Sequence, residues 1–224
     1  MAPAESGKEK AGKENTSMEK DRAALPRTVG YLHQKGGTGK STLAIATALA
    51  LTQSGRRVLL LDADYQGTSS EWGNRYGHQC GIETRSQVQP ILDREVGRFA
   101  GSFDDILIDG PPSLSEMTES ILKACSRVII PVRPALPDVW ALPWLAAIIR
   151  KLASQGHALQ PLVVFNQYSG EPLAPLREEV EKWHLPLHDE TLPLDPAFAQ
   201  VFFGKLPPGP LAEKLLGLLE NGQK

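Results

Sequence analysis

The stretch "QKGGTGKST", residues 34–42, gathers glycines, lysines and hydroxyl side chains in a pattern suited to binding phosphate. Glycines allow backbone N–H groups to converge on phosphate oxygens, and the N-terminus of a following helix also favours an anion. The ordinary phosphate-loop pattern has a further glycine five residues before Gly39. This chain has Gln34 at that position, followed at once by a second lysine, Lys35. The motif therefore predicts a phosphate loop with an additional cation.

The remaining loop residues have separable chemical roles in such a site. Lys40 is expected to reach the β- and γ-phosphates, and the Ser41 hydroxyl is placed to ligate Mg²⁺. A glycine turn that merely joins a strand to a helix is the alternative, and the predicted strand before the loop and helix after it argue against that alternative. The candidate nucleotide-binding residues of the loop are Lys35, Gly36, Gly37, Thr38, Gly39, Lys40, Ser41 and Thr42.

Carboxylates follow two other apolar runs. "LLLDADYQG" places Asp62 and Asp64 at the end of a predicted strand, on the same side if the strand continues, and "DDILIDGPP" ends a strand in Asp109. Carboxylates beside a phosphate loop suit Mg²⁺ and a polarised water. Each aspartate taken alone could equally be a helix cap or a turn former. Their shared position after strands favours a metal and catalytic role.

The elements that position these residues alternate along the chain. Short apolar runs predict buried strands, and longer amphipathic runs that end at glycine predict helices. Such alternation indicates an α/β fold with a mainly parallel sheet covered by helices on both faces, and with ligands at the carboxyl ends of the strands. The expected strands span 28–33, 57–64, 104–110, 127–132 and 161–167, and two of the expected helices span 40–55 and 141–156.

Length and composition set further bounds. The 224 residues are enough for one core, and we expect a single domain over 27–224 after a disordered, Lys- and Glu-rich tail over 1–26. The net charge of -2 excludes a generally basic nucleic-acid coat protein, although a local basic patch would not change that sum much. The residues include no secretory h-region and no apolar run long enough to cross a bilayer, so we expect a soluble, cytoplasmic protein.

These motifs carry a family resemblance. "KGGTGKST" resembles the deviant Walker A motif of the ParA/MinD group of ATPases, "LLLDADYQG" resembles that group's switch I, and "ILIDGPPSL" resembles its Walker B and switch II. The similarity continues through "VIIPVRPALPDVWA" and "VVFNQ", so it covers nearly all of the chain after the tail. With no separate N-terminal DNA-binding domain and with Trp72 shortly after switch I, the chain is most similar to the small ParA partition proteins. The resemblance implies a single P-loop NTPase domain.

The resemblance also implies roles for individual residues. Lys35 would be the signature lysine, which reaches across an ATP-sandwich homodimer to the phosphates bound by the other subunit. Asp64 would position the attacking water. Asp64, Lys35 and Lys40 would together be the catalytic residues. Ser41, Asp62 and Asp109 would hold Mg²⁺, and Asn166 would contact adenine. Because the loop has no obvious arginine finger in cis, ATP hydrolysis is expected to be slow and to be accelerated by an adaptor protein.

The same resemblance implies DNA as a binding partner. ParA proteins bind nonspecific double-stranded DNA as ATP dimers through basic side chains, so a nucleoid-associated location is expected, with sequence-blind, salt-sensitive binding. Lys205 and Lys214 are the named candidates, but "LPLDPAFAQVFFGK" lacks the arginine that many relatives carry after the matching proline. Four further basic residues are available in the same half of the chain, and each of the six could be a plain solvated charge: Arg150, Lys151, Arg177, Lys182, Lys205 and Lys214.

Two other functions remain open on sequence. A membrane-surface regulator like MinD would use a C-terminal amphipathic helix, but "GPLAEKLLGLLENGQK" favours a helix packed on the sheet, so stable membrane association is not expected. A metabolic ATPase of the same fold would activate a small substrate.

Cys80 and Cys125 lie outside the segment after Asp109 where nitrogenase-reductase relatives hold an iron–sulfur cluster. Trp140 and Trp144, at helical spacing, are expected in the core or on a dimer surface.

Overall fold

The structure is a computed structural model, and it describes residues 25–220. The predicted disordered tail over 1–26 therefore falls almost entirely outside the described residues. Within the described part, no helix has the length and apolar character needed to cross a membrane.

Six strands form one sheet in the order β3-β2-β4-β1-β5-β6, and every neighbouring pair is parallel. Parallel neighbours require long crossover connections, and helices or helical turns fill them here. This arrangement confirms the predicted α/β fold with a parallel sheet. The strands are β1 (Arg27–Tyr31), β2 (Val58–Asp62), β3 (Ile82–Ser86), β4 (Asp105–Asp109), β5 (Arg127–Val132) and β6 (Gln160–Phe165).

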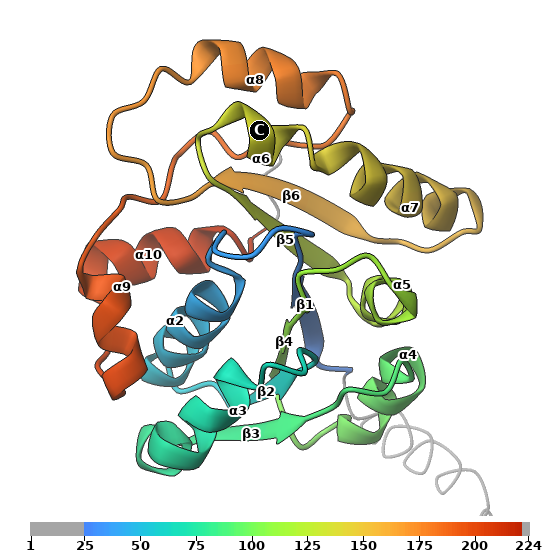
Figure 1. The fold of residues 1–224 in the computed structure, drawn as a ribbon. Helices are drawn as coiled ribbons and strands as arrows, with labels where there is room; N and C mark the ends of the chain where they lie inside the picture. The colour runs from blue at the N-terminus through green and yellow to red at the C-terminus, as the bar shows by residue number, and fades with distance from the viewer. Residues whose placement is uncertain (1–24, 221–224) are drawn as a thin grey trace, which may run out of the picture.

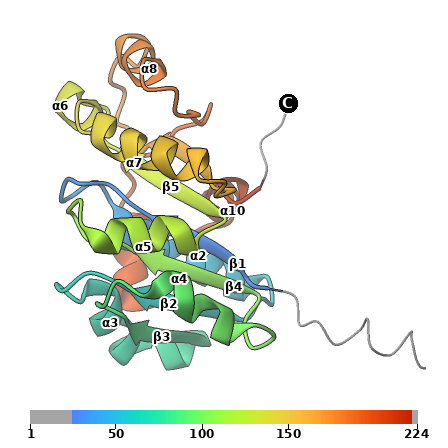
Figure 2. The ribbon, with the colours of Figure 1, turned by 90° about the vertical axis from the view of Figure 1, so that its right-hand side faces the viewer.

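Helices lie on both faces of the sheet, as Figure 1 shows. The α-helices are α2 (Lys40–Gln53), α3 (Thr68–Trp72), α4 (Leu92–Glu95), α5 (Glu116–Ala124), α6 (Leu136–Val139), α7 (Leu142–Ser154), α8 (Ala174–Glu181), α9 (Ala197–Gln200) and α10 (Gly209–Gly217). A π-helix, η1 (Gly73–Gly77), and three 3₁₀ segments, η2 (His78–Cys80), η3 (Val96–Phe99) and η4 (Val201–Phe203), complete them. Short α6 and α8 lie side by side in both views (Figures 1 and 2).

The alternation of side chains along each strand divides the core into two layers. In β4, Ile106 and Ile108 face the layer that includes α5 and α7, whereas Leu107 faces the layer that includes α2 and α10. All three side chains are completely buried. Because both faces are covered, central strands read as continuous apolar runs, which is why sequence alone identified them.

The last helix and the edge strand differ in how well the sequence predicts them. The predicted packing of the last helix is confirmed, because Leu211 and Leu215 of α10 are buried in the layer with α2. Strand β3, "IETRS", was not predicted. It is an edge strand in which only Ile82 is buried, so it lacks the apolar run that identifies a central strand.

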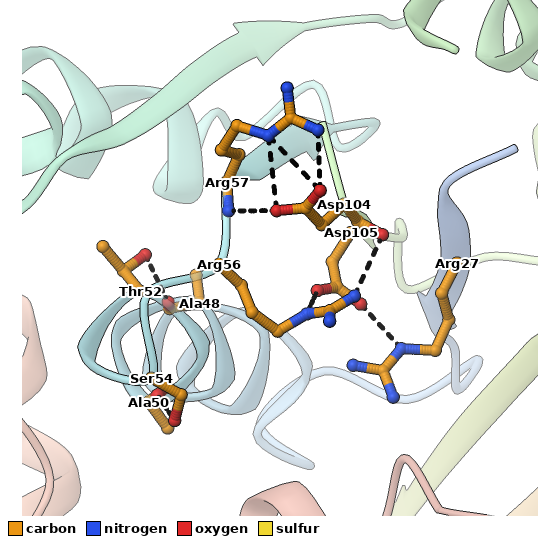
Figure 3. Close-up of polar contacts among 9 residues, drawn as sticks. All are labelled: Arg27, Ala48, Ala50, Thr52, Ser54, Arg56, Arg57, Asp104 and Asp105. Carbon is orange, nitrogen blue, oxygen red and sulfur yellow. Dashed lines mark hydrogen bonds and ion pairs between the residues drawn. The ribbon is translucent and has the colours of Figure 1, made fainter. Parts of the chain in front are cut away.

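Charged residues form ion pairs at the amino end of the sheet, opposite the phosphate loop. Asp105, whose side chain is fully buried at the start of β4, accepts a hydrogen bond from Arg27 Nε at 2.6 Å and also bonds to Arg56 (Figure 3). Next to it, Arg57 Nη2 donates to Asp104 Oδ1 at 2.7 Å on the surface. Two guanidinium groups thus neutralise the buried carboxylate of Asp105, and the bond from Arg27 links β1 to β4.

Candidate nucleotide-binding site

The phosphate loop runs from the end of β1 to the start of α2, as predicted. Gly37 and Gly39 have φ values of 75° and 98°, in the left-handed region that favours glycine. A Cβ atom on Gly39 would lie 2.2 Å from the side-chain nitrogen of Asn166, so no larger residue fits there. The glycines thus allow both the turn of the loop and its close approach to the end of β6.

Two amides after β6 hold the loop in place. Asn166 Nδ2 donates to the backbone oxygen of Thr38 at 2.8 Å, and Gln167 Nε2 donates to the backbone oxygen of Gly37 at 2.9 Å. Gln167 itself has a φ of 62°, which is uncommon for a residue other than glycine. Asn166 is buried and its Oδ1 has no hydrogen-bond partner among the described residues. That free oxygen is an acceptor beside the loop.

Lys40 points back along the loop. Its side chain is mostly buried, and Nζ donates to the backbone oxygen of Lys35 at 3.2 Å. Burial lowers the pKa of Lys40, and the carboxylates of Asp109 and Asp64 act in the opposite direction. The structure therefore brings Lys40 close to two of the three predicted carboxylates at the carboxyl ends of the strands.

Asp109 ends β4 beside Asp62 of β2, its partner in the strand register. Ser69 Oγ donates to Asp109 Oδ2 at 2.7 Å. Burial raises the pKa of Asp109 to about 7, the hydroxyls of Ser41 and Ser69 act to lower it, and the charge of Asp62 raises it. The other oxygen, Oδ1, is buried without a hydrogen-bond partner among the described residues.

Asp62 and Asp64 differ in their local roles. Asp62 is fully buried, and its carboxylate accepts from the backbone N–H of Asp64 at 3.1 Å and of Ser70 at 2.6 Å. Asp64 Oδ1 accepts from the backbone N–H of Gln66 at 3.1 Å. Because β2 ends at Asp62, Asp64 lies in the turn beyond the strand, so strand alternation does not place the two on one side. Both aspartates therefore also organise the turn, the alternative role that their sequence allowed.

The donor set fits a nucleotide with a hydrated magnesium ion. Asp109 Oδ1 and the hydroxyl of Thr38 are buried polar atoms without partners among the described residues, and such atoms call for a ligand or water. Oxygen ligands of this kind suit Mg²⁺, and Ser41, the second residue of α2, carries a further hydroxyl next to Lys40. The loop between Gly36 and Lys40 offers the glycine-rich backbone that phosphate requires.

The amino group of Lys35 is paired with a carboxylate of α6. Nζ lies 3.8 Å from Asp138 Oδ1 on α6, and the side chain is 36% exposed. The backbone N–H of Lys35 donates to His33 Nδ1 at 3.0 Å, so Nε2 carries the imidazole proton and donates to the backbone oxygen of Asp138 at 3.3 Å. Burial, together with the charge of Lys40, lowers the pKa of His33 to about 4 and keeps the ring neutral.

An arginine also lies beside the loop, which the sequence analysis did not anticipate. Arg133 follows β5 directly, and its Nη1 is 4.0 Å from the position that a Cβ on Gly37 would occupy. Its Nη2 bonds to Asp138 Oδ1 at 3.1 Å. The signal for Arg133 was its place at the carboxyl end of a strand, where ligands bind in such folds. His33 carried the same signal, because it ends the expected strand over 28–33. Asp138 gave none, because its role depends on contacts between distant segments.

These residues border a cavity of about 420 Å³ next to the phosphate loop. Its lining includes Lys35, Arg133 and Asp138, together with Gln167, Glu171 and Leu194. The lining combines two cations, two carboxylates and several apolar residues, and its place beside the loop is compatible with part of a nucleotide.

The DNA-binding candidates Lys205 and Lys214 do not line this cavity. Lys214 is paired with Glu190, whereas Lys205 Nζ donates to the neutral side chain of Gln200 at 2.9 Å. Two of the other basic residues, Lys151 and Lys182, are paired with Glu119 and Glu179. Surface ion pairs of this kind exchange readily with solvent and with phosphate, so both candidates remain predictions.

The tryptophans of α6 and α7 are not core residues. Trp140 and Trp144 are 58% and 68% exposed, so the expectation of a core position is wrong for both, and a dimer surface stays a prediction. Trp72 by contrast is buried, and its Nε1 donates to the backbone oxygen of Val201 at 2.8 Å.

Fold and site together define a P-loop nucleotide-binding protein: a parallel sheet, a glycine-rich loop leading into a helix, and carboxylates at the ends of the adjacent strands. Residues 31–202 match the family described as "CobQ/CobB/MinD/ParA nucleotide binding domain". This match covers most of the chain, and the chain belongs to that family. The resemblance to ParA and MinD proteins is thereby confirmed.

Two relatives and one solved structure resemble this chain over different shares of its length. "Maintenance of carboxysome distribution protein A" of Gloeobacter kilaueensis is 35% identical over 121 residues, which is 54% of this chain and only 55% of that relative. "Chromosome-partitioning ATPase Soj" of Thermus thermophilus is 29% identical over 194 residues, 70% of this chain and 75% of Soj. The solved structure of a Cyanothece McdA variant in complex with ATP is similar with a TM-score of 0.71 and 15% identity, covering 87% of this chain and 95% of that one. This last likeness shows the shared fold.

Proposed function

We propose that this protein is a ParA-type ATPase that dimerises on binding ATP, binds nonspecific DNA in that state, and positions a cargo. The observation that carries the proposal is Lys35: it belongs to the phosphate loop, yet its amino group lies 3.8 Å from Asp138 Oδ1 of α6, and its side chain is 36% exposed. A cation displayed in this way can reach phosphates bound by a second subunit. ATP, with more negative charge than ADP, would then favour the dimer.

The residues of the site have complementary parts in this proposal. The loop backbone and Lys40 bind the phosphates, and Asn166 Oδ1 is available to accept a hydrogen bond from adenine. Ser41, Asp62 and Asp109 would hold Mg²⁺, through its waters for the two aspartates, and when bound the ion neutralises charge on the phosphates. Asp64 orients the attacking water from the turn after β2.

Hydrolysis is proposed to be slow until an adaptor binds. Arg133, which directly follows β5, is a cation near the loop, but its guanidinium is bonded to Asp138. It is therefore not free to stabilise charge on the transferred phosphoryl group, a role that can speed hydrolysis by several powers of ten. An adaptor that completes the site would provide the acceleration.

The relatives support a positioning role. One is named for the distribution of carboxysomes and another for partitioning chromosomes, so the cargo is proposed to be a plasmid, a chromosome region or a large protein assembly. The proposed location is the cytoplasm, on the nucleoid. Lys205 and Lys214 are proposed DNA contacts.

Binding to a nonspecific duplex tests the proposal directly. The protein should bind with ATP and not with ADP, and the Lys35→Ala and Lys40→Gln variants should not bind with either nucleotide. Raising the salt from about 50 to 200 mM should weaken binding steeply, because neutralised phosphates release counterions. Sedimentation in parallel should show an ATP-dependent dimer. Absence of DNA binding with every nucleotide would contradict the DNA-tracking form of the proposal.

Two alternatives have their own outcomes. A MinD-like membrane regulator would co-sediment with anionic liposomes in the ATP state, but the leucines Leu211 and Leu215 that such a helix would present are buried against α2. A metabolic ATPase of this fold would hydrolyse ATP only with its small substrate, and would not bind DNA.

A further inference from the structure

Two cations share one buried carboxylate oxygen beside the phosphate loop. Asp138 Oδ1 lies 3.8 Å from Lys35 Nζ and 3.1 Å from Arg133 Nη2. The Asp138 side chain is 2% exposed, whereas those of Lys35 and Arg133 are 36% and 43% exposed. The three residues come from three segments: the loop after β1, the end of β5, and α6.

A carboxylate so well removed from water needs a cation. Removing the only partner of a buried charge is strongly destabilising, because the remaining charge stays desolvated and unpaired. If Lys35 alone neutralised Asp138, its departure to another subunit would carry that penalty. Arg133 avoids that penalty, because its guanidinium stays bonded to the Asp138 carboxylate when Lys35 leaves.

The position of Asp138 is fixed independently of its charge. Its backbone N–H donates to the oxygen of Ala135 at 3.0 Å, and its backbone oxygen accepts from His33 Nε2. His33 also holds the backbone of Lys35. The carboxylate is therefore set at one place relative to the loop, and a substitution that removes only its charge leaves these backbone contacts available.

We propose that Asp138 retains Lys35 within its own subunit and that Arg133 is the counter-cation that releases it, so that this pair sets how readily ATP drives dimerisation. The inference rests on the proposed function, in which Lys35 acts across the dimer. In the monomer, Lys35 and Arg133 both neutralise the carboxylate of Asp138. In the dimer, Lys35 moves to the partner's phosphates, and Arg133 alone neutralises Asp138.

The two residues should consequently have opposite effects. Asp138→Asn removes the attraction that retains Lys35, so the ATP concentration for half-maximal dimerisation should fall about threefold to tenfold. Arg133→Gln leaves Asp138 dependent on Lys35, so that concentration should rise by about the same factor. In the double variant, the Arg133 substitution should have little further effect, because the charge that it compensates is gone.

Glu171 provides a matched control. It borders the same cavity, but its carboxylate accepts hydrogen bonds from Ser169, at 2.8 Å from the backbone N–H and 2.7 Å from the hydroxyl. Glu171→Gln removes the same charge from the same cavity without removing a partner of Lys35. It should shift dimerisation much less than Asp138→Asn does.

A second readout reports on the contact without dimerisation. In the nucleotide-free protein, the rate at which Lys35 is acylated by a water-soluble N-hydroxysuccinimide ester can be followed by peptide mass spectrometry, with exposed Lys205 as the internal reference. Asp138→Asn should raise the relative rate of Lys35 severalfold, and Glu171→Gln should not. Melting temperatures show whether each variant is folded.

The outcomes separate the inference from the proposed function. If the unmodified protein fails to dimerise with ATP, the proposed function fails, whatever the acylation rates are. If it dimerises but Asp138→Asn and Arg133→Gln shift the ATP requirement in the same direction, the inference is wrong and the function stands. Should Asp138→Asn unfold, a fall in the ATP requirement of Arg133→Gln would overturn the inference by itself.

Discussion

The side-chain amide of Asn166 donates a hydrogen bond to the backbone oxygen of Thr38 over 2.8 Å, and so joins the end of β6 to the middle of the phosphate loop. The two residues are 128 positions apart in the chain. Because Thr38 and Asn166 are both buried, water cannot replace this bond. The shape of the loop thus depends on a strand from a distant part of the chain.

Replacing Asn166 with alanine should weaken both stability and nucleotide binding. The buried oxygen of Thr38 would lose its donor, which costs about 1–3 kcal/mol of unfolding free energy. Denaturation in urea and titration with a fluorescent ATP analogue measure the two effects. Gln167→Ala removes a more exposed bond to the same loop and should cost less. Equal losses in the two variants would contradict the role given to Asn166.

Asp109→Asn should change how stability depends on pH in the absence of Mg²⁺. The pKa of Asp109 rises from 3.8 to about 7, so its contribution to stability is full below the unfolded value and is lost as pH rises through 7. Asparagine does not titrate. The stability of the variant relative to the unmodified protein should therefore increase between pH 4 and 7, by at most about 1.4 kcal/mol per pH unit.

His33 supplies a control of opposite sign for that experiment. Its pKa falls from 6.5 to about 4, so its contribution is full above the unfolded value and is lost as pH falls through the folded one. The relative stability of His33→Asn should decrease as pH rises from 4 to 6.5. Urea denaturation at several pH values resolves both slopes, and parallel profiles for the two variants would rule out this assignment.

Asp105→Asn should destabilise the fold without altering the site. The buried carboxylate holds Arg27 and Arg56 at the amino end of the sheet. Weakening its charge-assisted hydrogen bonds should cost about 1.5–3 kcal/mol, because the two arginines left behind are 32% and 42% exposed and stay solvated. Nucleotide affinity, measured well below the melting temperature, should be unchanged. Asp104→Asn breaks only the surface pair with Arg57 and should have a much smaller effect on denaturation. A large loss of affinity in Asp105→Asn would show that the two ends of the sheet are coupled.

Leu215→Ala tests whether the last helix is part of the core. Leu215 is completely buried against the layer that contains α2, so the truncation should cost about 2–5 kcal/mol of unfolding free energy. Glu213→Ala alters an exposed position of the same helix and should be nearly neutral. A small effect of Leu215→Ala, together with ATP-dependent liposome binding, would instead favour a membrane role for this segment.

The class of fold and the phosphate loop could be predicted from the order of residues alone. Central parallel strands such as β4 are buried on both faces and therefore carry unbroken apolar runs, and a glycine-rich loop between strand and helix is a local pattern. The edge strand β3 was missed because only its first residue is buried, so it carries no apolar run. The other edge strand, β6, ends in three buried apolar residues and was predicted. Asp109 could be recognised because it directly ends such a run.

The surroundings of Lys35 could be known only from the folded chain. Lys35, Arg133 and Asp138 are brought together by the order β4-β1-β5, in which strands distant in the chain become neighbours. The clamp from Asn166 to Thr38 likewise needs β6 to lie at its place in the sheet. Local sequence specifies turns and periodicity, whereas electrostatic partners of a buried charge are selected by packing across the whole chain.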